Sequence, residues 1–218
     1  MSKLVATRIS LQFPPSPPTE PTDTLVLTFR SHYIDLRVLR SSLSSSPSQI
    51  AVDMGFAGTV SHNAPNHSKW EHVVDSNGSD EIDEGIFTLL PNGDEVEGGT
   101  TYNPDTGREE EYKEVWRQIP VEKGAPAYFL ESVDTAKTAG TKIFVGRIGL
   151  YFQAMGQTGS GGRGYSAKRW QLESGKWRLV YEIGGIDLPR PHDIGEVQEG
   201  DYLRVGVVSY LVREAYTI

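Results

Sequence analysis

The sequence predicts an all-β protein built from antiparallel strands, and three observations lead to this fold class. Apolar and polar residues alternate with a period of two along most of the 218 residues. Turn sequences such as Pro91-Asn-Gly-Asp94 interrupt the alternation at short intervals. No segment carries a helical pattern that a strand does not explain as well. About a dozen strands are expected, and barrels or a sandwich are the architectures that can bury them.

Five or six strands are expected in the first half of the chain, because Ser31–Arg37 either continues the strand that starts at Leu25 or follows a bend. The first ends at Pro14-Pro-Ser-Pro-Pro18, because proline donates no hydrogen bond to a β ladder. In the third strand successive side chains face opposite sides, so Ile34, Leu36 and Val38 share one face, with Tyr33, Asp35 and Arg37 on the other. The expected strands are Val5–Phe13, Leu25–Phe29, Ser31–Val38, Ile50–Val60, Trp70–Val74 and Ile82–Leu90.

The second half continues in the same style. Glu110–Ile119 fits a helical or a strand period, and we favour a strand because Pro120 follows and the surroundings are β. Ile143–Met155 is expected as one long strand that contains Gly149. The other expected strands are Tyr128–Val133, Tyr165–Leu172, Trp177–Ile183 and two between Tyr202 and Tyr216.

A faint internal repeat suggests two β units. In each half, an alternating strand with a tyrosine precedes a strand with a basic-Trp-polar sequence, Lys69-Trp-Glu71 and then Arg169-Trp-Gln171. The spacings of the two copies differ, so chance explains the repeat about as well as duplication. We place the expected boundary at residue 105, which gives an N-terminal unit of residues 1–105 and a C-terminal unit of residues 106–218.

The composition narrows the function classes. The chain has no cysteine, which excludes disulfides, thiolate metal sites and a cysteine nucleophile. His62, His67 and His72 are five residues apart, a step that reverses faces on a strand, so no metal site is expected. The glycine-rich segment Gly156–Gly164 lacks the Lys-Ser/Thr and the following helix of a phosphate-binding loop. No cofactor, no apolar run long enough to span a membrane and no signal peptide are indicated, and we expect a cytoplasmic protein.

The net charge of −8 is unevenly distributed. Between Glu71 and Glu114 there are 14 acidic residues and two basic ones. This segment repels phosphate backbones, so nucleic acid is not an expected partner. The preferred interpretation of the acidic segment is a solvated strand surface, and the second is a docking surface for a basic partner. A calcium site is the weakest interpretation, because the EF-hand spacing is absent; its ligands would be Asp80, Glu81, Asp83 and Glu84.

Five short motifs in order resemble one family. They are Ser-His-Tyr-Ile-Asp-Leu-Arg (31–37), Gly-Phe-Ala-Gly-Thr (55–59), Val-Glu-Gly-Gly-Thr-Thr-Tyr-Asn-Pro (96–104), Tyr-Lys-Glu-Val-Trp-Arg (112–117) and Val-Gly-Arg (145–147). This pattern resembles the fungal HRI protein family, named in yeast for interaction with a casein-kinase-I-type kinase. The resemblance implies two small lipocalin-like antiparallel β-barrels packed together, and it carries over no catalytic residues.

Barrels of this size can hold one small ligand, and several side chains carry the acid–base, cationic or aromatic groups that such a pocket would use. His32 lies in phase with an apolar face, where it is either a satisfied core histidine or a base. Arg147 and Tyr151 are expected on one face of one strand, where they either form an outer polar face or bind an enolate or phenolate oxygen. These three are the candidate catalytic residues. The candidate ligand-binding residues are Tyr33, Arg37, Trp116, Gln153 and Trp170.

Two function classes remain. The first is a cofactor-free isomerase or intramolecular cyclase of secondary metabolism that acts on a flat phenolic or polyketide-like molecule, with chalcone-isomerase-like ring closure as one possibility. The second is a non-catalytic binding protein with a protein kinase as a partner. Fold alone does not choose between them. The content of aromatic, Arg and Tyr residues favours the enzyme.

Overall fold

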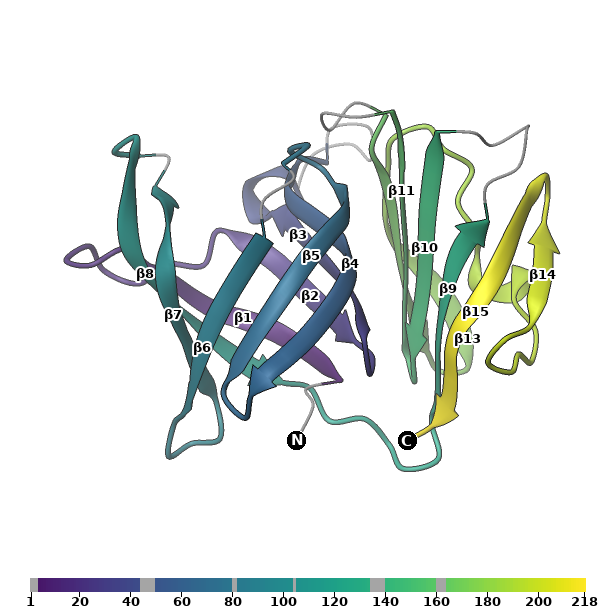
Figure 1. The fold of residues 1–218 in the computed structure, drawn as a ribbon, viewed down its shortest axis with the longest axis horizontal. Helices are drawn as coiled ribbons and strands as arrows, with labels where there is room; N and C mark the ends of the chain where they lie inside the picture. The colour runs from purple at the N-terminus through teal and green to yellow at the C-terminus, as the bar shows by residue number, and fades with distance from the viewer. Residues whose placement is uncertain (1–3, 44–49, 80–81, 104, 134–139, 160–163) are drawn as a thin grey trace.

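The structure is a computed structural model that describes residues 4–43, 50–79, 82–103, 105–133, 140–159 and 164–218. Two antiparallel sheets stand side by side, and both chain ends lie at the same end of the molecule (Figure 1). In the described residues the only helical segments are the short 3₁₀ turns Arg40–Ser42 and Pro191–Asp193. None of the described helices is long and apolar enough to cross a membrane.

The N-terminal sheet is a closed eight-stranded barrel in which β1 pairs with β8. Side chains alternate between the barrel interior and its outer wall, because successive residues of a strand face opposite sides. The strands are β1 (Val5–Gln12), β2 (Thr22–Thr28), β3 (His32–Leu39), β4 (Val52–Ala64), β5 (His67–Asp75), β6 (Ile82–Leu89), β7 (Glu95–Asn103) and β8 (Arg108–Gln118).

The C-terminal sheet is open and has seven strands in the order β13-β12-β11-β10-β9-β15-β14. Leu188 and Ile194, from the connection between β13 and β14, pack on the face of this sheet that lies away from the barrel. The strands are β9 (Pro126–Val133), β10 (Thr141–Ile148), β11 (Tyr151–Thr158), β12 (Ser166–Glu173), β13 (Lys176–Ile183), β14 (Tyr202–Val205) and β15 (Val208–Thr217).

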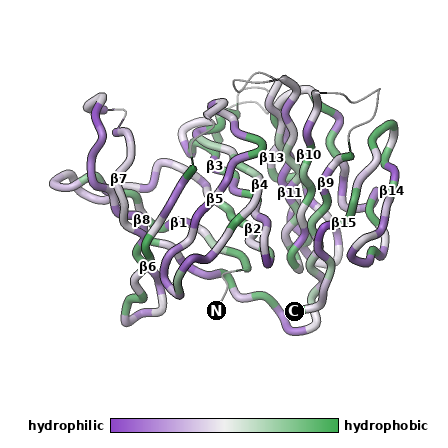
Figure 2. The backbone as a smooth tube through the Cα atoms, viewed as in Figure 1, coloured by the Kyte–Doolittle hydropathy of each residue, from purple (hydrophilic) through white to green (hydrophobic). Residues whose placement is uncertain are grey.

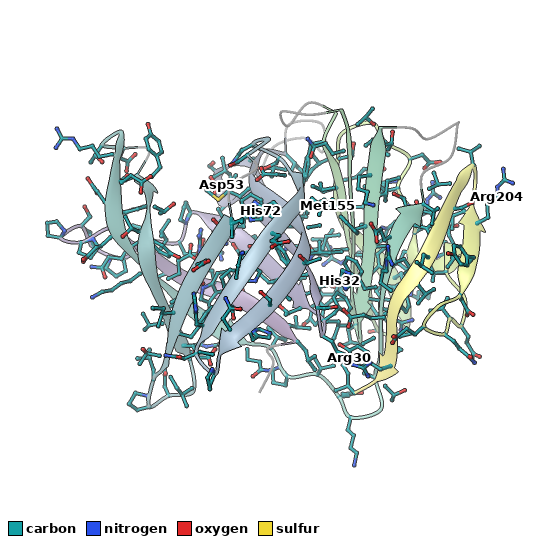
Figure 3. All side chains as sticks on the ribbon, in the orientation of Figure 1. Arg30, His32, Asp53, His72, Met155 and Arg204 are labelled. Atoms are coloured by element: carbon teal, nitrogen blue, oxygen red, sulfur yellow. The ribbon has the colours of Figure 1, made fainter. Side chains whose placement is uncertain are left out.

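The largest apolar core lies between the two sheets and outside the barrel. Outward-facing residues of β2 and β3, such as Leu27 and Leu36, pack against Phe129, Phe144 and Met155 of the C-terminal sheet. Figure 3 places His32 and Met155 in this interface. Hydrophobic residues accordingly concentrate on β9, β10 and β11, whereas the hairpin of β7 and β8 is largely hydrophilic (Figure 2). Burying one large side chain here contributes about 1.5–3 kcal/mol.

The all-β prediction is confirmed, and so is the strand interpretation of residues 110–119. Two closed barrels are not confirmed, because the C-terminal sheet remains open between β13 and β14. β8 pairs with both β1 and β7 and so closes the barrel. The N-terminal sheet therefore extends to Gln118, beyond the expected boundary at residue 105. Part of the glycine-rich segment, residues 160–163, lies outside the described residues.

The expectation of one strand from Ile143 to Met155 is wrong. The chain forms a hairpin, in which β10 and β11 pair with Ile148 opposite Tyr151. Gly149 takes a positive φ of 55°, a conformation that suits glycine and lets the chain reverse at Gly149 and Leu150. Such a two-residue turn reverses the phase of the alternation, but both faces of this hairpin are apolar: Phe144 and Ile148 face one core, and Phe152 and Ala154 face the other. The reversal therefore leaves no visible break in the sequence, which explains the error.

Candidate functional site

The barrel interior is charged and aromatic. On β3 the inward side chains are Tyr33, Asp35 and Arg37, all from the face that the sequence predicts opposite the apolar one. Arg37 lies with its guanidinium carbon 5.4 Å from the ring centroid of Trp116 on β8. Three of the five residues expected to bind a ligand, Tyr33, Arg37 and Trp116, therefore line this interior, and Arg37 and Trp116 lie close together.

An ion-pair network anchors the arginines of the interior. Arg37 contacts Asp35 at 2.8 Å and Glu114 at 3.0 Å. Arg8, which is 3% exposed, also donates to Glu114 and to Glu20. Buried charges of this kind are stable only when paired and hydrogen-bonded, and here two arginines share one carboxylate. The network fixes the positions of the side chains beside it.

Three polar atoms in the same interior have no hydrogen-bond partner among the residues that the structure describes. They are the Tyr33 hydroxyl, Asp35 Oδ1 and Trp116 Nε1. Each of these residues is buried, with 3%, 4% and 6% exposed. An unpaired buried polar group costs about 1–3 kcal/mol, so three in one interior are a feature that a bound ligand would explain.

The protonation states of two of these groups suit acid–base chemistry. Burial raises the pKa of the Asp35 carboxyl, and the neighbouring Arg37 opposes the rise. Burial, together with the charge of Asp35, raises the pKa of Tyr33 well above its usual value, so its hydroxyl keeps its proton and remains a donor. A carboxylate with a raised pKa is a candidate general base.

One wall of the barrel is formed around His72 on β5 (Figure 3). Its ring stacks on Phe56 at 4.2 Å, and its two nitrogens lie 2.8 Å from Asp75 and 3.2 Å from Asp83. Burial alone would lower the pKa of His72, but the hydrogen bonds to the two carboxylates outweigh it and raise the pKa to about 9. His72 is therefore a cation at neutral pH, held by two aspartates.

His32 and Gln153 lie outside the barrel, in the interface with the C-terminal sheet. The His32 ring stacks on Phe129 at 4.4 Å, and Nδ1 lies 2.7 Å from Glu214. Gln153 is 1% exposed and donates to the backbone oxygens of Leu25 and Ile34. Both side chains are held by protein groups, which corresponds to the satisfied-core interpretation of His32.

Arg147 and Tyr151 do not share a face. The expectation that the two residues lie on one strand is wrong. Arg147 is on β10, where it pairs with Phe152, and Tyr151 is on β11, where it pairs with Ile148. Tyr151 packs against the interface core, whereas Phe152 belongs to the core on the opposite side of the sheet. Trp170 lies opposite Phe152 on β12 and therefore shares the far face with Arg147. The eight predicted site residues thus fall into three places.

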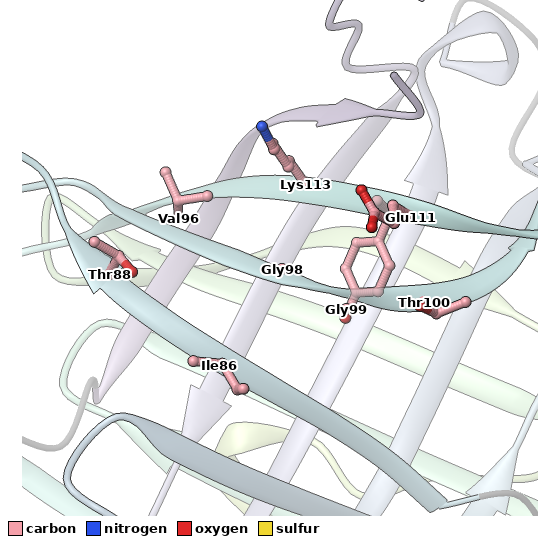
Figure 4. A pocket seen from close by; sticks show the side chains of 9 residues that line it. Ile86, Thr88, Val96, Gly98, Gly99, Thr100, Glu111 and Lys113 are labelled. Atoms are coloured by element: carbon pink, nitrogen blue, oxygen red, sulfur yellow. The ribbon is translucent and has the colours of Figure 1, made fainter. Parts of the chain in front are cut away.

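A shallow groove of about 420 Å³ marks the outer wall of the barrel over β6, β7 and β8 (Figure 4). Its lining includes the apolar side chains of Ile86 and Val96, the backbone of Gly98, and the charged side chains of Glu111 and Lys113. Much of the acidic segment lies on these strands. Asp80 and Glu81, of the calcium interpretation, lie outside the described residues.

Sequence reasoning did not select Asp35 and His72. Asp35 could have been found, since it alternates with Tyr33 and Arg37 on the face opposite the apolar residues. His72 could not, because its partner Asp83 lies on the neighbouring strand and only the strand pairing brings the two together.

The comparisons with known proteins agree with this architecture. The family model described as Protein HRI1 matches residues 4–214. The chain belongs to the HRI1 family. A crystal structure of an uncharacterized protein from Saccharomyces cerevisiae is similar, with a TM-score of 0.77 and 18% identity, over 97% of this chain and 98% of that one. At this identity the similarity to the yeast protein shows the fold alone. No curated protein matches the chain.

Proposed function

We propose that this HRI1-family chain binds a flat phenolic or polyketide-like molecule in the barrel interior and catalyses its isomerisation or ring closure without a cofactor. One observation carries the proposal: the Tyr33 hydroxyl, Asp35 Oδ1 and Trp116 Nε1 are buried in the same interior, and no described residue hydrogen-bonds to them. A carboxylate base and two fixed donors are the groups that such a reaction needs.

The reaction can be written for a 2′-hydroxychalcone as substrate. Asp35 takes the phenolic proton, and the phenolate oxygen forms a bond to the β-carbon of the enone. The π electrons move to the carbonyl oxygen, where the Tyr33 O–H and the Trp116 N–H stabilise the enolate. The proton returns from Asp35 to the α-carbon. The product is an isomer of the substrate, so no oxidant, reductant or cofactor is consumed.

The walls of the interior suit a flat ligand. Trp70 and Phe87 meet edge to face at 5.9 Å, and Phe56 stacks on His72. Aromatic rings contribute large apolar contact areas with defined orientation, which favours planar molecules over flexible ones. Arg37 bridges Asp35 and Glu114 and so positions the base.

The experiment measures flavanone formation from 2′-hydroxychalcones by the rate above buffer and by the enantiomeric excess of the product. Wild-type protein is expected to give one enantiomer in excess. Tyr33→Phe is expected to lower kcat/KM by about 10²-fold and Asp35→Asn by about 10²–10⁴-fold. Melting curves check that each variant folds.

Tyr151→Phe is the matched control, because it removes a tyrosine hydroxyl from the interface and not from the barrel interior. Its activity is expected to equal that of wild type. A racemic product formed at the buffer rate by wild-type protein would overturn the proposal. Activity that survives Tyr33→Phe and Asp35→Asn but not Tyr151→Phe would move the site out of the barrel.

The acidic outer wall supports a second candidate, a non-catalytic chain that binds a basic protein partner such as a kinase. Glu109 and Glu111 are exposed on β8, and Glu111 borders the groove of Figure 4. Charge complementarity steers such a partner to this wall. The double charge reversal Glu109→Lys/Glu111→Lys is expected to weaken binding of a lysine-rich peptide, measured by calorimetry, and unchanged affinity would argue against this candidate.

A further inference from the structure

The far face of the C-terminal sheet carries a row of side chains that the proposed function does not use. The strand register places Tyr128, Arg147, Phe152 and Trp170 side by side across β9, β10, β11 and β12. Trp177 on β13 joins them, with its ring 6.2 Å from that of Phe152. The row thus contains one arginine and four aromatic side chains.

Among the described residues, Arg147 differs from the other half-buried or buried arginines in having no carboxylate partner. Arg8, Arg37 and Arg169 each pair with an acidic side chain. Within the part of the chain that the structure describes, Arg147 donates to the Gly149 backbone oxygen at 3.0 Å and lies 5.1 Å from the centroid of the Trp177 ring. A guanidinium withdrawn from water without a counter-ion is costly, and an anion would offset that cost.

Two hydrogen-bond donors lie in the same row as the guanidinium. Tyr128 is 4% exposed; burial raises the pKa of its hydroxyl to about 12, and the adjacent Arg147 holds the rise down. The hydroxyl therefore keeps its proton at neutral pH. Farther along the row, Trp170 Nε1 is buried and has no hydrogen-bond partner within the described part of the chain. Two strand spacings, about 10 Å, separate Arg147 from Trp170, with Phe152 between them.

We propose that this row is a second ligand site, distinct from the barrel interior, and that it binds a planar aromatic carboxylate. The carboxylate lies against the guanidinium of Arg147 and the hydroxyl of Tyr128. The aromatic ring packs on the half-buried Trp177, which itself rests edge-on against the buried Phe152, and a polar substituent at its far end accepts from Trp170 Nε1. A planar guanidinium matches a carboxylate with two parallel hydrogen bonds, which favours a carboxylate over a point-charged anion such as chloride.

The test is calorimetric titration of the full chain with 1-naphthoate and with the neutral 1-naphthamide. Naphthoate is expected to bind at one site, at least about tenfold more tightly than the amide. Arg147→Gln is expected to weaken naphthoate binding at least about tenfold, whereas Arg178→Gln is expected to leave it unchanged. Arg178 is a suitable control because it lies on β13 but is exposed and paired with Glu173.

A second measurement on wild-type protein locates the ligand without any variant. The indole N–H signals of Trp170 and Trp177 are expected to shift in ¹⁵N-resolved NMR spectra on addition of naphthoate, while those of Trp70 and Trp116 in the barrel remain in place. Absence of saturable binding, equal affinity for the amide, or shifts confined to Trp70 and Trp116 would each overturn the proposal. None of these outcomes depends on whether Asp35 and Tyr33 catalyse a reaction.

Discussion

His32 Nδ1 on β3 of the barrel lies 2.7 Å from Glu214 Oε1 on β15 of the C-terminal sheet. The same carboxylate accepts hydrogen bonds from the backbone N–H groups of Arg30 and Ser31, at 2.7 and 3.0 Å. One acidic side chain of the second sheet thus holds the turn between β2 and β3. The hydrogen bond between His32 and Glu214 and the stacked rings of His32 and Phe129 join the two sheets at the edge of their shared core.

Glu214→Gln is expected to lower the free energy of unfolding by about 1.5–3 kcal/mol at pH 7, because charged acceptors make the stronger hydrogen bonds. Burial would raise the pKa of Glu214, but its hydrogen bonds lower it below the usual value. The wild-type advantage is therefore present above the unfolded pKa and lost as pH falls through the folded one. Urea unfolding at pH 7 and pH 3 measures it, and a difference that stays constant between these values would contradict the assignment.

Glu114→Gln is expected to cost about 3–5 kcal/mol, since it leaves the buried Arg8 and Arg37 with too little negative charge. Chemical denaturation followed by tryptophan fluorescence measures the change. The matched control is Glu173→Gln, which removes one partner of the exposed pair with Arg178 and should leave the midpoint unchanged. Equal effects of the two substitutions would mean that the interior network contributes no more than a surface pair.

His72 should make the protein less stable in alkaline solution. Its pKa is raised to about 9 in the folded chain, so its contribution is complete below its ordinary value of 6.5 and is lost as pH rises through about 9. The shift corresponds to about 3 kcal/mol. His72→Gln is expected to flatten the dependence of unfolding free energy on pH between 6.5 and 9, and a curve parallel to that of wild type would show that another group titrates.

The two sheets are expected to unfold together, because their largest apolar core is shared. Phe129→Ala removes a fully buried ring from that core and should cost about 3–5 kcal/mol. For wild type and for Phe129→Ala alike, far-ultraviolet circular dichroism and tryptophan fluorescence are expected to report the same single thermal transition. Two separated transitions in wild type would show that the barrel is stable without the sheet.

Period-two alternation predicted the strands well because it reports one physical fact, which side of a strand is buried. It placed Ile34, Leu36 and Val38 on one face and Tyr33, Asp35 and Arg37 on the other, as the structure has them. The pattern contains no information on which face is inside the barrel. Site candidates were therefore taken from both faces, His32 in phase with the apolar one and Tyr33 and Arg37 from the other. The structure packs the apolar face against the second sheet and turns the other face into the barrel.

The separation of Arg147 and Tyr151 could not be predicted for a similar reason. The two-residue turn at Gly149 and Leu150 reverses the phase of the alternation, but β10 and β11 carry apolar residues on both faces, so a hairpin and a straight strand look alike in sequence. The positive φ of Gly149 is the decisive feature, and any glycine is compatible with it. Long-range partners such as Glu214 for His32 are likewise set by packing of the two sheets.

The position of the largest core outside the barrel has an evolutionary consequence. Substitutions of residues that face the barrel interior leave the apolar contacts between the two sheets intact. The interior ion pairs of Arg8, Arg37 and Glu114 stay balanced if these residues change together. Selection can therefore retune the barrel lining while the outward faces of β2 and β3 stay constrained. Descendants of one ancestral chain are then expected to diverge fastest inside the barrel, where a new lining costs the scaffold least.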